Sequence, residues 1–399
     1  MEEVRLGTLT NRKIGYGIVQ PGASVPHGIP VIKVNNIISG LRNVRDLDTT
    51  SIGNDKKYSR TKLKGGELIV SVVGTIGRTA IVPMNFAGCN LVRATALIDI
   101  PDVQMSKWVK YYIDSPKGQN YIRENLNTTV QPTLNVKSLV EMPIPVYSTQ
   151  YMQKAIEILG NIDDKIEVNR RINDNLEQQA QALFKSWFVD FEPFKDGDFV
   201  ESELGMIPKG WRVGNIYEYI DVIYGAPYKS TLFNDNKNGL PLIRIRDLKT
   251  NAPQFYTPEV LPNTEYINAG DIVAGMDAEF IPYVWLGEKG VLNQRCCKFK
   301  GKNEAISNYY ILFLIKPELE YVQSYKTGTT VSHLGKSDID RFRFITPPLD
   351  VVLYFSGQIN SMKEEVVSRA KESRRLASLR DTLLPKLMSG ELKLNEVNM

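Results

Sequence analysis

Side chains suited to contacting DNA occur in turns and at the ends of predicted strands in both halves of the chain. An arginine can donate two hydrogen bonds to guanine, Asn and Gln can pair with adenine, and Lys or Thr commonly binds phosphate. The clearest example is Val73–Arg78, a glycine-flanked turn that presents a hydroxyl and a guanidinium. The pattern predicts DNA contacts at Lys33, Asn35, Thr75, Arg78, Arg93, Thr129 and Gln131, and at Arg244, Arg246, Arg295, Thr330, Ser332 and His333.

Each of these residues taken alone is equally compatible with a solvated surface or a structural role. The arginines in particular could pair with carboxylates such as Glu67 or Asp271 and serve folding. The prediction therefore depends on recurrence, because the same residue types return in equivalent loops. Arg93 and Arg295, for example, each follow a glycine by five positions.

The sequence lacks the patterns that would support catalysis or metal binding. Leu334–Ser337 ends like a phosphate-binding loop, but Thr330 stands where that loop would open with glycine. Thr346–Leu349 reads Thr-Pro-Pro-Leu, which is not a motif for amino methylation. Three cysteines and two histidines form neither a disulfide framework nor a metal-ligand spacing. We therefore expect a non-catalytic chain without a metal or cofactor of its own.

The composition is that of an ordinary globular protein. The chain has 399 residues, of which 42% are hydrophobic and 24% charged, so it can form two domains with real cores. A net charge of +4 is compatible with nucleic acid but is weak support for it. No apolar run approaches the length of a membrane span, and Met1–Arg5 does not begin a signal peptide. These features predict a cytoplasmic protein.

Two long stretches, 155–187 and 355–387, carry the same seven-residue pattern of apolar positions. Steps alternating between three and four residues are typical of a coiled-coil seam. Both seams become polar at the same point, around Asn169 and Arg369. Two unrelated amphipathic helices would not share this register. The predicted helix-pairing positions are Leu159, Ile162, Ile166, Leu176 and Leu183, and Ile359, Met362, Val366, Leu376 and Leu383.

The segments before the two seams also repeat. Gly28–Val34 returns as Gly239–Ile245, and Gly66–Val70 returns as Gly270–Ala274, at offsets of about 200 to 211 residues. Strands that keep their order while loops differ in length produce such a wandering offset. The chain is thus predicted to be a tandem repeat with a common scaffold and individual loops.

These patterns predict an α+β fold in which two α/β recognition domains are separated by two long antiparallel helices forming a coiled coil, with pseudo-two-fold internal symmetry. Antiparallel pairing would bring the two polar breaks together. The predicted domains are 1–147 and 206–347, with spacer helices in 148–190 and 348–399 and a connector in 191–205. Pro385 should kink or end the second helix.

The order of variable domain, long helix, variable domain, long helix resembles the specificity subunit of type I restriction-modification enzymes. The resemblance rests on Leu204–Trp211, Val73–Arg78, Thr128–Asn135 and Ala182–Phe191, and it covers nearly the whole chain. It implies two target recognition domains that each read half of a bipartite double-stranded DNA sequence. It further implies that the helices dock two modification subunits, which carry S-adenosylmethionine and the adenine methyltransferase site. A motor-nuclease subunit using ATP and Mg would join them for cleavage.

One departure from this resemblance concerns the two seams, because Arg380 and Pro385 replace Ala180 and Lys185. The two docking faces therefore need not be equivalent. A specificity subunit of an orphan methyltransferase without a nuclease would have the same sequence. A coiled-coil interaction protein that binds no DNA is the alternative from another class, and it would show no salt-dependent duplex binding. The target bases and gap length are not readable from the residues.

Overall fold

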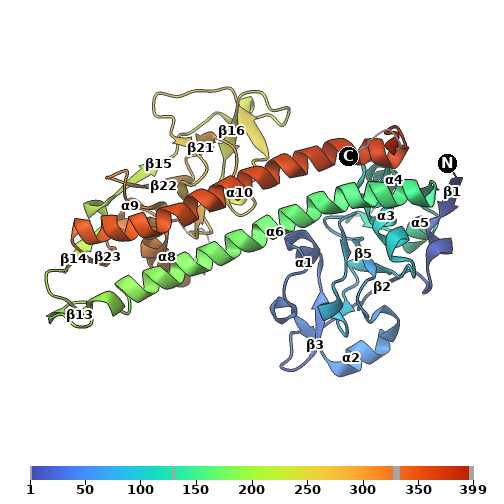
Figure 1. The fold of residues 1–399 in the computed structure, drawn as a ribbon, viewed down its shortest axis with the longest axis horizontal. Coiled ribbons are helices and arrows are strands. Elements are labelled where there is room, and N and C mark those ends of the chain that lie inside the picture. The colour runs from blue at the N-terminus through green and yellow to red at the C-terminus, as the bar shows by residue number, and fades with distance from the viewer. Residues whose placement is uncertain (1, 128–130, 327–332, 395–399) are drawn as a thin grey trace. The chain divides into compact units, whose positions relative to one another are not determined.

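A computed structural model describes residues 2–127, 131–326 and 333–394. The chain divides into two compact units, one formed by residues 1–164 and 376–399 and the other by residues 165–375. Two helices of 40 and 41 residues, α6 (Thr149–Phe188) and α10 (Leu349–Ser389), each contribute one part to each unit (Figure 1). The predicted limits of the recognition domains remain predictions.

The first unit contains a four-stranded antiparallel sheet in the order β2-β8-β5-β6. A three-stranded sheet, β4-β3-β7, pairs β3 and β7 in parallel, and β1 pairs with β11. Buried aliphatic residues of β5 and β8 form the core with Trp108. The strands are β1 (Glu2–Arg5), β2 (Gly15–Tyr16), β3 (Ile29–Ile32), β4 (Thr49–Thr50), β5 (Leu68–Ser71), β6 (Thr79–Ile81), β7 (Asn90–Leu91), β8 (Thr95–Ile98), β9 (Leu126–Asn127), β10 (Thr133–Leu134) and β11 (Pro143–Val146).

Helix α3 packs against β5 and β6 of this sheet, and polar side chains cap the starts of α3 and α4. Asp102 accepts hydrogen bonds from backbone amides at the start of α3, and Ser115 does the same for α4, which begins at a proline. The helices of this part are α1 (Val34–Ser39), α2 (Ile52–Lys57), α3 (Val103–Asp114), α4 (Pro116–Glu124) and α5 (Val136–Val140).

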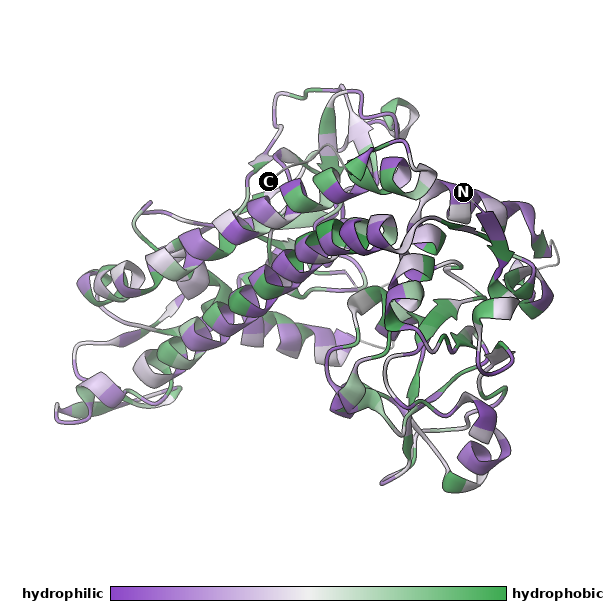
Figure 2. Ribbon diagram, turned by 45° about the vertical axis from the view of Figure 1, so that its right-hand side comes forward, coloured by the Kyte–Doolittle hydropathy of each residue, from purple (hydrophilic) through white to green (hydrophobic). Residues whose placement is uncertain are grey.

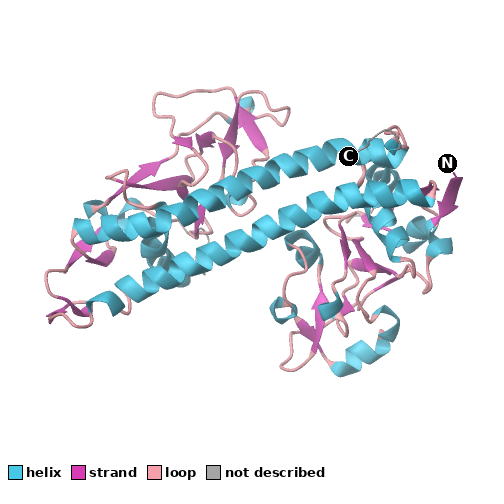
Figure 3. Ribbon diagram, in the orientation of Figure 1, coloured by secondary structure: helices cyan, strands magenta, loops and turns pink. Residues whose placement is uncertain are grey.

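The second unit repeats the strand order. Its four-stranded antiparallel sheet is β15-β22-β19-β20, and a second sheet, β17-β16-β21-β18, again contains one parallel pair, β16 with β21 (Figure 3). The elements are β12 (Phe199–Ser202), β13 (Gly205–Pro208), β14 (Arg212–Asn215), β15 (Ile220–Tyr224), β16 (Leu240–Ile243), β17 (Phe255–Thr257), β18 (Tyr266–Ile267), β19 (Ile272–Gly275), β20 (Pro282–Val284), β21 (Gly290–Leu292), β22 (Cys296–Gly301), β23 (Arg343–Thr346), α7 (Ile245–Leu248), α8 (Asn308–Lys326) and α9 (Lys336–Ile339).

The predicted internal repeat is confirmed by these matching sheets. In both copies a strand with proline at its second position leads into a short helix, β3 into α1 and β16 into α7. The loops differ, and the predicted connector contains a strand that was not expected, because β12 pairs with β13 as a hairpin.

Within the second unit, α6 and α10 run antiparallel. Asn169 is fully buried, and its amide donates to Glu372 Oε2 at 2.7 Å and to Ser373 Oγ at 3.3 Å. Its oxygen accepts a hydrogen bond from Arg369 Nη1 at 3.2 Å. Asn173 donates to the Val366 carbonyl, so residue numbers rise on one helix as they fall on the other. The prediction that the two polar breaks meet is confirmed.

The parts of α6 and α10 in the first unit are also antiparallel, because Tyr151 donates to the Leu387 carbonyl at 2.9 Å and Asp163 pairs with Arg380. Apolar and polar residues alternate along both long helices (Figure 2). Pro385 was predicted to kink or end the second helix. The helix does not end there, since it continues to Ser389, and the kink stays a prediction. Burial of Leu384 and Leu387 in the core of this unit offsets the cost of a proline inside a helix, roughly 3 kcal/mol.

Candidate nucleic-acid interface

The turn Val73–Arg78 of the first unit is held in shape by its glycines and by Ser71. Gly74 and Gly77 have φ angles of 76° and 82°, a region that side chains with a Cβ rarely adopt. The Ser71 hydroxyl donates to the Thr75 carbonyl at 2.6 Å and accepts from the Arg78 amide at 2.8 Å. The side chains of Thr75 and Arg78 are left exposed at the turn.

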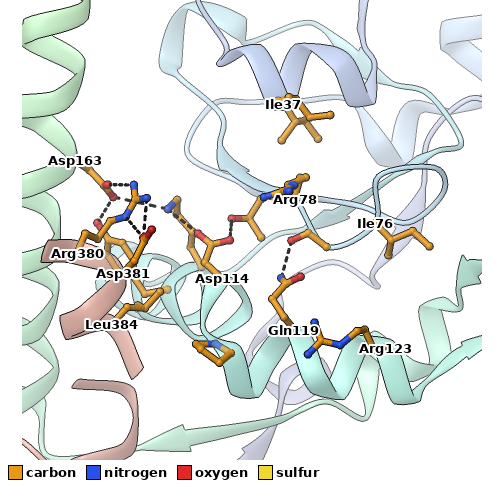
Figure 4. A pocket seen from close by; sticks show the side chains of 16 residues that line it. Ile37, Ile76, Arg78, Asp114, Gln119, Arg123, Asp163, Arg380, Asp381 and Leu384 are labelled. Atoms are coloured by element: carbon orange, nitrogen blue, oxygen red, sulfur yellow. Dashed lines mark hydrogen bonds and ion pairs between the residues drawn. The ribbon is translucent and has the colours of Figure 1, made fainter. Parts of the chain in front are cut away.

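Helix α4 supports this turn from one side. The Gln119 amide donates to the Gly77 carbonyl at 3.0 Å, and a Cβ on Gly77 would lie 2.8 Å from Gln119 Oε1. A cleft of about 910 Å³ opens beside the turn, and Arg78 and Arg123 line it (Figure 4). Within residues 2–127, 131–326 and 333–394, the Arg78 guanidinium has no ion-pair partner, so it is available to an anion. Sequence reasoning did not single out Gln119.

The other predicted contacts of the first unit are exposed but differ in their partners. Lys33 forms an ion pair with Asp48 at 2.6 Å. Asn35 and Gln131 are exposed. Arg93 is exposed as well, and no carboxylate in the described part of the chain pairs with it. The predicted contact Thr129 lies outside the described residues.

In the second unit, Arg244 has a structural role. Its side chain is 17% exposed, pairs with Asp247 at 3.2 Å and lies 4.4 Å above the Phe255 ring. These contacts use the guanidinium within the fold, and a contact of Arg244 with DNA stays a prediction. The neighbouring Arg246 is exposed and has no ion-pair partner among the residues the structure covers.

A charged cluster joins two other predicted residues of this unit. Asp277 pairs with Arg295 at 3.2 Å and with the His333 ring at 2.7 Å, and all three side chains are at least partly exposed. Asp277 occupies the place of Val73, since Val73 bridges to Thr133 as Asp277 bridges to His333. Ala278 then adopts a φ of 63° where the first turn has Gly74. Thr330 and Ser332 lie outside the described residues.

Asp277 was missed because the first copy has the apolar Val73 at the equivalent position. The carboxylates considered as structural partners of the arginines are occupied elsewhere. Glu67 pairs with Arg12, and Asp271 pairs with Lys298. Sequence reasoning also did not single out Gln323. Its amide donates to the Ala278 carbonyl at 3.0 Å, as the Gln119 amide donates to the Gly77 carbonyl. Both turns are therefore supported by an amide from a helix that follows in sequence.

The predicted helix-pairing positions are all shielded from solvent to some degree. Leu159, Ile162, Ile359 and Val366 are buried. The remaining positions are partly buried, namely Ile166, Leu176, Leu183, Met362, Leu376 and Leu383. The three cysteines are free and buried. Among the described residues, no cluster of potential metal ligands occurs, and no helix is long and apolar enough to cross a membrane.

Comparison with known proteins places this fold and these turns in a family. The family of the type I restriction modification DNA specificity domain matches residues 2–178 and 208–358, which is most of the chain. The chain therefore belongs to this family. It is a specificity subunit of a type I restriction-modification system, a component that recognises DNA and is not itself catalytic.

The chain is also similar to individual specificity subunits. The MjaIX specificity subunit of Methanocaldococcus jannaschii is 29% identical over 74% of this chain and 71% of its own length. The HindI specificity subunit of Haemophilus influenzae is 27% identical over 66% of this chain and 72% of its own. The solved S subunit from M. genitalium shares 14% identity over 97% of this chain and 95% of its own, with a TM-score of 0.49.

Proposed function

We propose that the chain reads a bipartite sequence in double-stranded DNA, with one globular part recognising each half-site. The observation that carries this proposal is the duplicated scaffold with unlike turns. The two sheets have the same strand order, yet one turn presents Thr75 and Arg78 while the other presents Asp277, which is paired with Arg295 of a neighbouring loop. Because base contacts depend on the side chains at such edges, two unlike turns on one scaffold suit two unlike half-sites.

The helix pair would set the distance between the half-sites and bind the partner subunits. The proposed partners are two copies of a modification subunit, which would carry S-adenosylmethionine and the adenine methyltransferase site, and a motor-nuclease subunit using ATP and Mg. The complex would act in the cytoplasm. The family assignment and the absence of catalytic motifs from the sequence support a role for this chain in recognition, with catalysis in the partner subunits. A specificity subunit of an orphan methyltransferase differs only in lacking the nuclease partner.

Domain exchange tests the modular reading. The chain would be co-expressed with its modification subunit, and methylated adenines would be mapped across genomic DNA. Replacing residues 212–345 with the corresponding unit of a relative should change one half of the methylated sequence and leave the other intact. The matched control replaces the first globular unit and should change the opposite half. If either exchange alters both halves, the proposal is wrong.

Insertion in the helices tests the spacing role. Seven residues added to each helix near the hydrogen-bonded pair Asn169 and Arg369 would retain the seam and lengthen the rod by roughly 10 Å. That length corresponds to about three base pairs. The gap in the methylated sequence should grow accordingly while both half-sites stay the same. A gap of unchanged length would contradict the spacer role.

A further inference from the structure

A series of polar contacts in the first unit runs from the turn Val73–Arg78 to the long helices. Thr79 follows this turn, and its hydroxyl donates to Asp114 Oδ1 at 2.5 Å. The other oxygen of Asp114 pairs with Lys110 Nζ at 3.0 Å. Lys110 in turn lies 4.0 Å from Asp163 on α6. These contacts border the cleft that Arg78 also lines (Figure 4).

The series ends on an ion pair between the two long helices. Arg380 Nη1 of α10 lies 2.9 Å from Asp163 Oδ1, and the Tyr111 hydroxyl of α3 donates to the other oxygen of Asp163 at 2.9 Å. Burial, together with the Asp163 carboxylate, raises the pKa of Tyr111, so the phenol stays protonated and remains a donor. Burial opposes the charge of Arg380, but its hydrogen bonds to Asp163 raise the pKa of the guanidinium overall. The carboxylate of Asp163 thus links α3, α6 and α10.

The second unit has lost this series at every step. Three observations set the register of the repeat. The strand pairs Val70–Thr79 and Ala274–Pro282 align Thr79 with Pro282 at an offset of 203. Pro116 and Pro317 align α3 with α8 at an offset of 201, and the seven-residue pattern aligns the long helices at an offset of 200. In this register Thr79, Lys110, Tyr111, Asp114, Asp163 and Arg380 correspond to Pro282, Ile311, Leu312, Ile315, Lys363 and Ala180. Four of the replacements are buried apolar residues of the helices, Ile311, Leu312, Ile315 and Ala180. A coordinated exchange of six positions indicates that the polar residues act together.

We propose that Asp163 and Arg380 are positioning residues that orient the turn Val73–Arg78 of the first unit and thereby control how accurately the first half-site is read. The inference rests on the proposed bipartite recognition. Hydrogen bonds and ion pairs hold their partners in defined directions, so this series fixes the orientation of α3 and of the strand that leaves the turn. Loss of the ion pair would leave Arg78 in place on its turn but free the domain to shift against the helices.

The test uses the full complex with the modification subunit and DNA duplexes that carry one mismatch in either half-site. Wild type is compared with Arg380→Met, Asp163→Asn and the conservative variant Arg380→Lys. The matched control is Lys165→Met, which removes an exposed ion pair with Glu372 between the same two helices. The measured quantity is the ratio of methylation rates on cognate and mismatched duplexes, with thermal unfolding of each variant as a check on folding.

We expect Arg380→Met and Asp163→Asn to reduce discrimination in the first half-site by about tenfold, the size of one well-placed base contact. Discrimination in the second half-site should stay within about twofold of wild type by the same measure. Arg380→Lys should recover part of the loss, and Lys165→Met should behave as wild type. Equal loss in both half-sites, or no loss in either, would overturn the inference. Domain exchange that fails to separate the half-sites would instead overturn the proposed function.

Discussion

Both globular parts pack apolar and aromatic side chains against their helices, and the first part adds a series of polar contacts. In the second unit the meeting point is aromatic: the Phe355 ring of α10 lies 4.8 Å from Phe188 and 5.5 Å from Trp187, and Tyr310 of α8 packs against the same group. In the first unit the equivalent positions are Ala155, Leu387 and Met388, which pack with Trp108 in the core. The first unit also contains the Asp163–Arg380 ion pair and an open cleft. Both copies therefore use ring packing next to the helices, and the first copy adds directed polar contacts between α3, α6 and α10.

Apolar packing and ion pairs contribute differently to the stability of a fold and to the orientation of its parts. Burial of rings stabilises strongly but without direction, at roughly 25 cal/mol per Å² of apolar surface. A partly exposed ion pair contributes little net stability and weakens with salt, yet it defines an angle between its partners. We therefore expect the aromatic surface to secure the fold of the second unit and the polar one to adjust the orientation of the first.

The largest effect is expected from Ala180→Arg, which moves the polar residue of the first copy into the second. Ala180 is fully buried, and the position equivalent to Asp163 is Lys363, so the new guanidinium would meet a like charge instead of a partner. An overpacked, unpaired buried charge should cost at least about 5 kcal/mol in the unfolding free energy of the second unit. Chemical denaturation measures the total loss of stability, and hydrogen exchange of backbone amides in each unit shows where the loss occurs.

The control for that exchange is Gln181→Arg, one position further along and exposed. It should leave both units at wild-type stability. Comparable stability of the two variants would show that the junction of the second unit tolerates charge, and the contrast between the units would fail.

Removal of the central ring, Phe355→Ala, should have the next largest effect. The side chain is completely buried among four aromatic neighbours, so its loss leaves a cavity and should cost about 4 kcal/mol. Protection of amides in the first unit should stay unchanged. If amide protection fell equally in both units, the two units would unfold cooperatively, and the expected difference between them would be wrong.

Arg380→Ala, the reverse of the first exchange, should be mild. The pair is partly exposed and its removal leaves Asp163 with Tyr111 as a donor, so we expect a loss of about 1–2 kcal/mol in the first unit. Because charges carry the contact, the difference between variant and wild type should shrink as salt rises. Unfolding midpoints at low and high salt measure this, and a salt-independent difference would contradict the electrostatic explanation.

The smallest effects concern the equivalent arginines Arg93 and Arg295 on DNA. The unpaired Arg93 should bind phosphate, so Arg93→Ala should weaken all duplexes alike and reduce the salt slope of binding by about one. Arg295 is already neutralised by Asp277 and should change the slope less. Duplex affinity measured against salt compares them, and equal slopes for the two variants would remove the distinction between the turns.

Much of the fold could be predicted because its signals are local. The seven-residue pattern specified which face of each long helix is buried, and antiparallel pairing then required Asn169 to meet Arg369. The repeated strands could be aligned because Gly66–Val70 and Gly270–Ala274 have the same order of polar and apolar residues. The hairpin in 199–208 was missed because its strands are short and largely exposed.

The partners of the candidate site residues could not be predicted from the sequence. Three arginines that pair with carboxylates illustrate this. Arg244 is paired three residues away but is also held by Phe255, Arg295 is paired with Asp277, and Arg380 is paired with Asp163 at a separation of 217 residues. The residue type determines what a side chain can bind. Whether a carboxylate of the same chain already binds it depends on which residues folding brings together.

The sequence by itself thus determined that the chain is a duplicated scaffold on two paired helices, because hydrophobic period and residue order are properties of the chain. Only the tertiary structure decided which guanidiniums lack a carboxylate partner among the described residues. It also decided that one domain adds a series of polar contacts to the apolar packing by which both domains meet their helices. Those outcomes depend on pairings between distant residues, whose geometry no local pattern encodes.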